Sequence, residues 1–183
     1  MIIGITGTDG AGKGLVVEYL VNQKGFTHFS SRALILEEIH KRGLPSDRDH
    51  LRLVANDLRR EFGNEFLIKK SYEIAEREGV QSAVIESLRA MAEVEYLKAH
   101  GGVLIAVDAD QRLRYERIQS RQSESDAVTF EKFIEQEALE MNDPDPSGMQ
   151  KAAVIAAADY VILNNGTPDE VYVQIGSMLE KLS

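Results

Sequence analysis

The sequence predicts an α/β protein with a doubly wound, parallel sheet, and three observations support this fold class. Five short apolar segments, rich in valine and isoleucine, are distributed over the 183 residues. Stretches with apolar residues at helical spacing lie between them. A glycine-rich turn follows the first apolar segment. Near-continuous apolar runs are typical of strands covered on both faces, and strands that alternate with helices form parallel sheets.

The expected strands and helices alternate along one domain. The strands are IIGIT (2–6), FTHFS (26–30), SAVIE (82–86), VLIAVD (103–108) and YVILN (160–164). The helices are expected within 12–25, 32–43, 90–102, 110–121, 129–141 and 167–182, and two more within 47–78, which break near Gly63. Gly25 and Gly43 end two of these helices, and Thr129 is a good N-cap for another. Polar segments at 121–127 and 142–148 are expected to be loops.

Composition restricts the class of protein. An apolar fraction of 43% is enough for a buried core. A net charge of −9 argues against a nucleic-acid partner, because binding to phosphate backbones requires a basic surface. No apolar run approaches 18 residues, so no membrane partner is expected. The absence of cysteine fits a reducing cytoplasm. Two further sets are expected to be structural or solvated: the histidines His28, His40, His50 and His100, and the helical carboxylates Glu135, Glu137 and Glu140.

The segment GTDGAGKG (7–14) is the strongest functional signal. It lies between an expected strand and an expected helix, which is the context that a phosphate-binding loop requires. Glycines let successive backbone N–H groups converge on phosphate oxygens, and the N-terminus of the helix adds partial positive charge. Lys13 supplies a cation for the β- and γ-phosphates. Gly14 stands where the general motif G-x-x-x-x-G-K-[ST] has a hydroxyl, and Leu15 follows it.

This loop resembles that of adenylate kinase and other nucleoside monophosphate kinases, which read G-x-P-G-x-G-K-G-T. Gly14 agrees with that pattern, whereas Asp9 replaces proline and Leu15 replaces threonine. The resemblance implies a sheet of order 2-3-1-4-5 of the P-loop NTPase type, with ATP and Mg²⁺ as cofactors. Because Leu15 has no side-chain oxygen, magnesium would rely on phosphates, water and a distant carboxylate. Asp9 would be unfavourable near phosphates unless it faces away or caps the helix. The implied ATP contacts are Gly7, Asp9, Gly10, Ala11, Gly12, Lys13, Gly14 and Leu15.

The same resemblance extends to an acceptor site. Monophosphate kinases carry D-G-F-P-R after the third strand, and this chain has Glu86-Ser-Leu-Arg89. By similarity, Glu86 would hold magnesium through water and Arg89 would bind the acceptor phosphate. After the second strand, Ser31 and Arg32 occupy the region that contacts the acceptor in these enzymes, although a simple capping serine would also fit.

Two more segments fit the resemblance. VDADQRLRYERIQSR (107–121) matches a strand, an aspartate and a helix with two arginines four residues apart. Arg117 and Arg121 would therefore share one helix face and stabilise the transferred phosphoryl group as catalytic residues. Arg112 and Arg114 lie on other faces and are expected to be solvated. In ADYVILNNGTPDEV (158–171), Asn165 and Gly166 would lie at the base of ATP; this segment also resembles dephospho-coenzyme A kinases.

The sequence as a whole predicts a single kinase domain spanning 1–183. An acceptor-binding helical segment is expected at about 31–78 and a short lid at about 121–148. The predicted reaction is ATP-dependent phosphoryl transfer to a small phosphate-bearing acceptor, with a nucleoside monophosphate as the first choice. Dephospho-coenzyme A is the alternative acceptor, and a nucleotide-dependent switch or ATPase is the alternative of another class. The segments NDLRREFG (56–63) and GMQKAAVIAAADYVI (148–162) also resemble little-characterised archaeal and bacterial adenylate-kinase-like proteins. The roles of Arg59 and Arg60 and the oligomeric state stay open.

Overall fold

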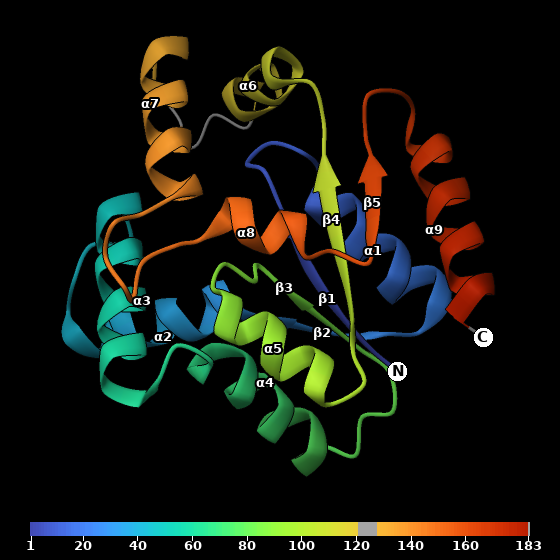
Figure 1. Ribbon diagram of the computed structural model, residues 1–183, viewed down its shortest axis with the longest axis horizontal. Helices are drawn as coiled ribbons and strands as arrows, with labels where there is room; N and C mark the ends of the chain where they lie inside the picture. Colours follow the sequence, from blue (N-terminus) through green and yellow to red (C-terminus); the bar gives the residue numbers. More distant parts are fainter. Residues whose placement is uncertain (121–127, 183) are drawn as a thin grey trace.

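The computed structural model describes residues 1–120 and 128–182. Its centre is a five-stranded sheet of order β2-β3-β1-β4-β5 in which every strand pairing is parallel (Figure 1). The strands are β1 (Ile2–Gly7), β2 (Thr27–Ser30), β3 (Ala83–Glu86), β4 (Val103–Asp108) and β5 (Tyr160–Leu163). This confirms the predicted sheet and strand order, and each strand lies within one residue of its expected bounds.

Helices cover both faces of this sheet (Figure 1). They are α1 (Lys13–Lys24), α2 (Ser31–Arg42), α3 (Arg48–Phe62), α4 (Phe66–Arg77), α5 (Met91–Ala99), α6 (Gln111–Ser120), α7 (Phe130–Met141), α8 (Lys151–Ala156) and α9 (Pro168–Leu182). The six-residue helix α8 was not expected from the sequence, because it is too short to show helical periodicity. None of the helices in the described ranges combines the length and apolarity that crossing a membrane requires.

The helices form where apolar spacing and end residues agree. Gly25 and Gly43 close α1 and α2 in the left-handed conformation, with φ values of 71° and 67°. Ser30 caps α2 by accepting a hydrogen bond from the backbone N–H of Ala33 at 3.3 Å. Helices α1 and α9 bury Leu20 and Ile175 against one face of the sheet, while α4, α5 and α8 pack on the other face. A third cluster joins α2, α3 and α4.

The strand register brings several sequence motifs to one edge of the sheet. Ser30 at the end of β2 is aligned with Glu86 at the end of β3, and Glu86 is aligned with Ile5 of β1. Gly7, which ends β1, is aligned with Val107 of β4. Ligands of doubly wound proteins bind at this carboxyl edge of the strands. The fold therefore places the glycine-rich loop and the motif at 86–89 side by side.

Candidate functional site

The glycine-rich loop is built as a turn with two left-handed glycines before α1. Gly10 and Gly12 have φ values of 79° and 93°, a region that favours glycine. A Cβ atom on Gly12 would lie 2.2 Å from Nδ2 of Asn164. The same Nδ2 donates a hydrogen bond to the carbonyl of Ala11 at 2.8 Å, and Asn164 is buried. The loop is therefore held against the end of β5 by an amide that only glycine at position 12 can accommodate.

Lys13 folds back over this loop. Its Nζ donates to the carbonyl oxygens of Gly7 at 3.0 Å and Thr8 at 2.8 Å, and it lies 3.8 Å from Oδ1 of Asp9. Burial of the ammonium group lowers the pKa of Lys13 to about 8, and the nearby charges of Lys151 and Arg89 act in the same direction. Asp9 and Glu86 act in the opposite direction. A cation with a lowered pKa beside glycine amides is well suited to an anionic ligand.

Asp9 occupies an unexpected position. It neither faces away from the loop nor caps α1; its Oδ1 accepts a hydrogen bond from Nζ of Lys151 at 3.0 Å. Lys151 begins α8, is only 2% exposed and also pairs with Glu140 of α7. The expectation that Glu140 is solvated is therefore wrong, because α7 turns this carboxylate inward to neutralise a buried lysine.

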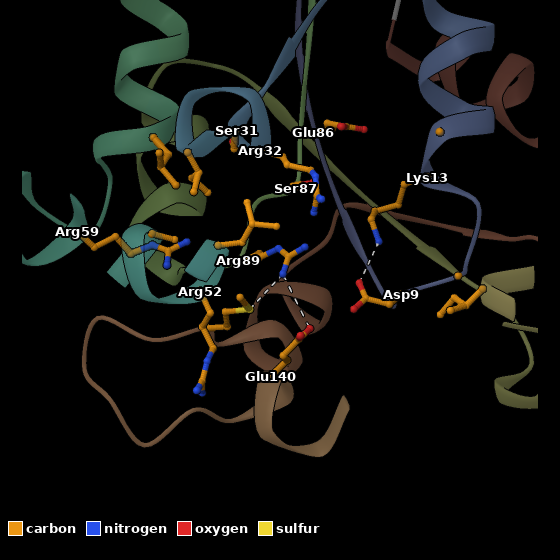
Figure 2. A pocket seen from close by; sticks show the side chains of 18 of the residues that line it. Asp9, Lys13, Ser31, Arg32, Arg52, Arg59, Glu86, Ser87, Arg89 and Glu140 are labelled. Atoms are coloured by element: carbon orange, nitrogen blue, oxygen red, sulfur yellow. Dashed lines mark hydrogen bonds and ion pairs between the residues drawn. The ribbon is translucent and has the colours of Figure 1, made fainter. Parts of the chain in front are cut away.

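A cleft of about 480 Å³ opens beside the loop (Figure 2). One end is formed by the loop and α1, and the other end by α2, α3 and α4. Its lining residues are Asp9, Gly10, Gly12, Lys13, Gly14, Ser31, Arg32, Ile35, Leu51, Arg52, Ala55, Arg59, Leu67, Glu86, Ser87, Arg89, Ile118, Glu140 and Met149. The cleft thus unites the phosphate loop with the predicted acceptor residues Ser31, Arg32 and Arg89.

Glu86 lies at the end of β3 with a fifth of its side chain exposed to the cleft. Its Oε1 is 3.6 Å from Nε2 of His28 and accepts a hydrogen bond from Oγ of Ser30 at 3.3 Å. The contact with His28 is the main cause that holds the pKa of Glu86 below its usual value, and Lys13 adds to it. The carboxylate is therefore ionised at neutral pH.

Ser87 marks a strained backbone at the same strand end. It has a φ of 73°, and its N–H and that of Leu88 both donate to the carbonyl of Ile5, at 2.9 and 3.1 Å. Left-handed backbone at a non-glycine residue is uncommon and often accompanies functional sites. These two hydrogen bonds to the carbonyl of Ile5 hold the motif at 86–89 against β1.

Arg89 extends from this motif into the middle of the cleft. Its Nη1 donates to Sδ of Met149 at 3.2 Å and lies 3.9 Å from Oε2 of Glu140. Glu140 already neutralises Lys151, so it compensates the guanidinium only in part. The backbone N–H of Arg89 is fixed by Oε2 of Glu93 at 2.7 Å.

The arginines at 112, 114, 117 and 121 agree only in part with the prediction. Arg117 does not line the cleft; its Nη2 donates to Oδ1 of Asn164 at 3.4 Å, and its Nη1 is buried without a partner. Arg121 lies outside the described residues. Arg112 is exposed, as expected. The expectation for Arg114 is wrong: its side chain is 6% exposed and pairs with Glu137, which is therefore not solvated either.

Arg114 supports the phosphate loop from behind. Its Nε donates to the carbonyl of Ala109 at 3.0 Å, and its Nη1 donates to the carbonyl of Asp9 at 3.1 Å. The buried ion pair with Glu137 thus connects α6, α7 and the loop. Helical spacing alone could not show this, because α7 covers the face of α6 that carries Arg114.

The remaining predicted ATP contacts surround the loop without lining the cleft. Gly7 ends β1, and Ala11 is fully buried. Leu15 packs against the core between α1 and the sheet. Asn165 accepts a hydrogen bond from the N–H of Asp110 at 2.7 Å, and Gly166 follows it. The contact of Asn165 and Gly166 with ATP stays a prediction.

Sequence reasoning missed three residues of this site, which are His28, Lys151 and Arg52. It left the role of Arg59 open, with a contact to the acceptor phosphate as one option. His28 is expected from the sequence to be a surface or packing residue, yet it contacts Glu86. Its position two residues before the carboxyl end of β2 was the only sign in the sequence that it lies near the site. Arg59 and Lys151 lie in the segments 56–63 and 148–162, whose resemblance to other proteins assigns no role to either residue, and Arg52 lies in no motif. Only the tertiary fold shows that these residues belong to the site.

Comparison with known proteins places the chain in a family. Residues 3–142 match the family model described as an AAA domain. A UPF0200 protein of Pyrococcus horikoshii is 31% identical over 190 residues, which cover 100% of this chain and 97% of the relative. The chain belongs to the UPF0200 family. The name of this relative states no activity.

The solved structures that are similar to this UPF0200 chain extend the comparison to its fold. Shikimate kinase from Bacteroides thetaiotaomicron has a TM-score of 0.64 at 16% identity and covers 100% of this chain and 98% of its own. A gluconokinase from Sinorhizobium meliloti has a TM-score of 0.53 at 14% identity, with 98% and 94% covered. At these identities the likeness shows the fold alone, which is P-loop NTPase-like and is shared with these two kinases. It does not single out the nucleoside monophosphate kinases that the sequence resembles.

Proposed function

We propose that this protein is an ATP-dependent kinase that transfers a phosphoryl group to a small, phosphate-bearing acceptor, with a nucleoside monophosphate as the first choice. One observation carries the proposal. Lys13 of the phosphate loop and Arg89 of the strand-end motif reach into the same cleft, which also contains the carboxylate of Glu86 (Figure 2). The kinase names of the structural relatives support the same class of reaction.

The residues divide into a donor end and an acceptor end. The loop amides and Lys13 would hold the β- and γ-phosphates of ATP, as glycine-rich loops before helices do. Arg89 would bind the acceptor phosphate, because its guanidinium has an incomplete counter-charge and can form paired hydrogen bonds to an oxyanion. Phosphoryl transfer depends on positioning and charge stabilisation, so no general base is required of the protein.

The described residues could hold magnesium through water and one carboxylate, together with the phosphates of the nucleotide. Among them, no group of three or more histidine, aspartate or glutamate side chains is arranged as a metal cage. Mg²⁺ in kinases is commonly held by nucleotide phosphates, water and one or two carboxylates. Glu86, ionised and partly exposed at the strand end, would contribute through water. When bound, the ion would supply charge neutralisation for the phosphates.

Arg117 would act from behind the loop. Its buried Nη1 has no partner, and Nη2 reaches Asn164, whose amide touches the loop at Ala11. We infer that Arg117 stabilises the transferred phosphoryl group once nucleotide is bound. Arg121 keeps the same predicted role.

The decisive experiment measures ATP consumption with each common nucleoside monophosphate and with dephospho-coenzyme A. We expect turnover with a monophosphate and a loss of about a hundredfold or more in kcat/KM for the acceptor in Arg89→Ala, with ATP binding intact. Arg112→Ala is the matched control, because Arg112 is exposed and pairs with Glu116 away from the cleft.

The alternatives give different results in the same experiment. Turnover with dephospho-coenzyme A alone would identify that acceptor. ATP consumption that needs no acceptor and is unchanged in Arg89→Ala would indicate an ATPase or switch. Consumption no higher than in Lys13→Ala would refute the kinase proposal altogether.

A further inference from the structure

The inner end of the cleft contains a buried arginine that the proposed reaction has not used. Arg59 projects from α3, lines the cleft and is only 2% exposed. Its Nε is buried and has no hydrogen-bond partner. Its Nη1 makes two long hydrogen bonds, to Oδ1 of Asn56 and to the carbonyl of Ser147, both at 3.4 Å.

The charge of Arg59 is poorly compensated. Within the described ranges, no carboxylate oxygen lies within 4.0 Å of its guanidinium. Glu93 and Asp143 act on it from a longer distance, but Glu93 already accepts the backbone N–H groups of Arg89 and Ala90. Asp143 lies 3.7 Å from Nη1 of Arg52. Burial, reinforced by the like charge of Arg89, lowers the pKa of Arg59.

A buried cation whose counter-charges lie only at a distance is costly, and proteins normally pair such groups directly. Here two arginines repel each other in the same part of the cleft, and Figure 2 shows the side chain of Arg59 extending toward that of Arg89. The same wall holds a second orphaned donor: Oγ of Ser31, which is 2% exposed and has no partner. An oxyanion in this part of the cleft would give Nε of Arg59 the acceptor that it lacks.

We propose that Arg59 and Arg89 together bind one oxyanion of the acceptor, so that Arg59 is a substrate-binding and specificity-determining residue. The inference rests on the proposed kinase function and deepens it. An acceptor with a phosphate or carboxylate group fits this pair, whereas a neutral acceptor leaves the two charges uncompensated. Arg59 therefore excludes neutral alcohols and sugars as substrates.

The test uses thermal unfolding of the full chain, with the phosphate loop first saturated by a non-hydrolysable ATP analogue. Inorganic phosphate, AMP and acetate are then titrated separately. We expect phosphate and AMP to raise Tm of the wild type further, and Arg59→Met to weaken their apparent affinity by about tenfold to a hundredfold. Arg60→Met is the matched control: Arg60 is the next residue, its side chain is 51% exposed, and it pairs with Asp57 and Asp145.

The outcomes separate the proposals. The Tm of unliganded Arg59→Met does not decide the question, because Glu93 and Asp143 lose a distant counter-charge in this variant. A phosphate response in Arg59→Met equal to that of the wild type would show a purely structural arginine and would overturn the inference. If Arg59→Met does not fold, Arg59→Lys takes its place, because lysine keeps the charge but loses the planar fork. A wild type that responds to none of the three probes also overturns the inference. A response to acetate alone identifies a carboxylate acceptor. No response to the ATP analogue refutes the kinase function instead.

Discussion

The lowered pKa of Lys13 predicts that nucleotide binding takes up a proton. In the unliganded protein this pKa is about 8, against a usual value of 10.5. The difference corresponds to roughly 3 kcal/mol, the free energy of keeping a charged ammonium group in this pocket without an anion. Polyphosphate beside Nζ favours the charged form and should restore the pKa to its usual range or above.

The magnitude follows from the fraction of Lys13 that is neutral before binding. With a pKa of about 8, this fraction is about 0.1 at pH 7, about 0.5 at pH 8 and about 0.9 at pH 9. Binding should take up the same number of protons, and nucleotide affinity should fall as pH rises through 8. The unfolded chain, with a higher lysine pKa, binds more protons between about pH 8 and 10.5. The unliganded protein should therefore gain stability across that window.

The assay is isothermal titration calorimetry of a non-hydrolysable ATP analogue in pairs of buffers that differ in ionisation enthalpy. Lys13→Arg is the control, because arginine stays charged throughout and removes this contribution while the nucleotide's own proton balance persists. We expect the wild type to exceed Lys13→Arg by about half a proton at pH 8. Equal proton uptake in the two proteins would refute the reasoning.

Three further predictions concern the support of the loop. Arg114→Met should destabilise the fold by about 3–5 kcal/mol in urea unfolding, because it leaves the carboxylate of Glu137 uncompensated. Arg112→Met is the exposed control and should change the free energy of unfolding by about 0.5 kcal/mol or less. Equal effects of the two substitutions would contradict the assigned ion pair. Gly12→Ala should lower the stability of the fold by at least about 1–2 kcal/mol in thermal unfolding. Gly14→Ala is the control and should leave the stability unchanged, because a Cβ atom at position 14 meets open space. Asp9→Asn should lower the pKa of the loop lysine further, so the proton-uptake curve should move to lower pH; an unchanged curve would show that Asp9 does not act on it.

The sheet and the centre of the site could be predicted from the sequence because both depend on short, contiguous segments. Strands such as β1 and β4 are apolar runs that need cover on both faces, and the turn after β1 has its phosphate-binding character within eight residues. Glu86 and Arg89 follow a strand directly, so parallel topology alone brings them to the loop. Each of these features is determined by residues that are close together along the chain.

The rest of the site depends on packing between distant segments. Arg114 was expected in solvent because periodicity describes one helix at a time, yet α7 covers it and supplies Glu137. Helix α8 has six residues and no periodic signal, but it delivers Lys151 to the loop. The role of Arg59 stays open in the sequence, because its burial appears only once the loop at 142–150 packs over it. Such residues become identifiable only when the fold determines what surrounds them.

The acid in the phosphate loop, Asp9, also depends on a residue from a distant segment. An acid is unfavourable beside phosphates, but Oδ1 of Asp9 lies 3.0 Å from Nζ of Lys151 and 3.8 Å from Nζ of Lys13, so two cations compensate its negative charge. An incoming polyphosphate competes with Asp9 for Lys13. Lys151 also pairs with Glu140, and Glu140 lies beside Arg89. Lys13 and the acceptor arginine are therefore the two ends of a chain of five side chains joined by four ion-pair contacts. The substitution of acid for proline thus links the donor end of the cleft to its acceptor end.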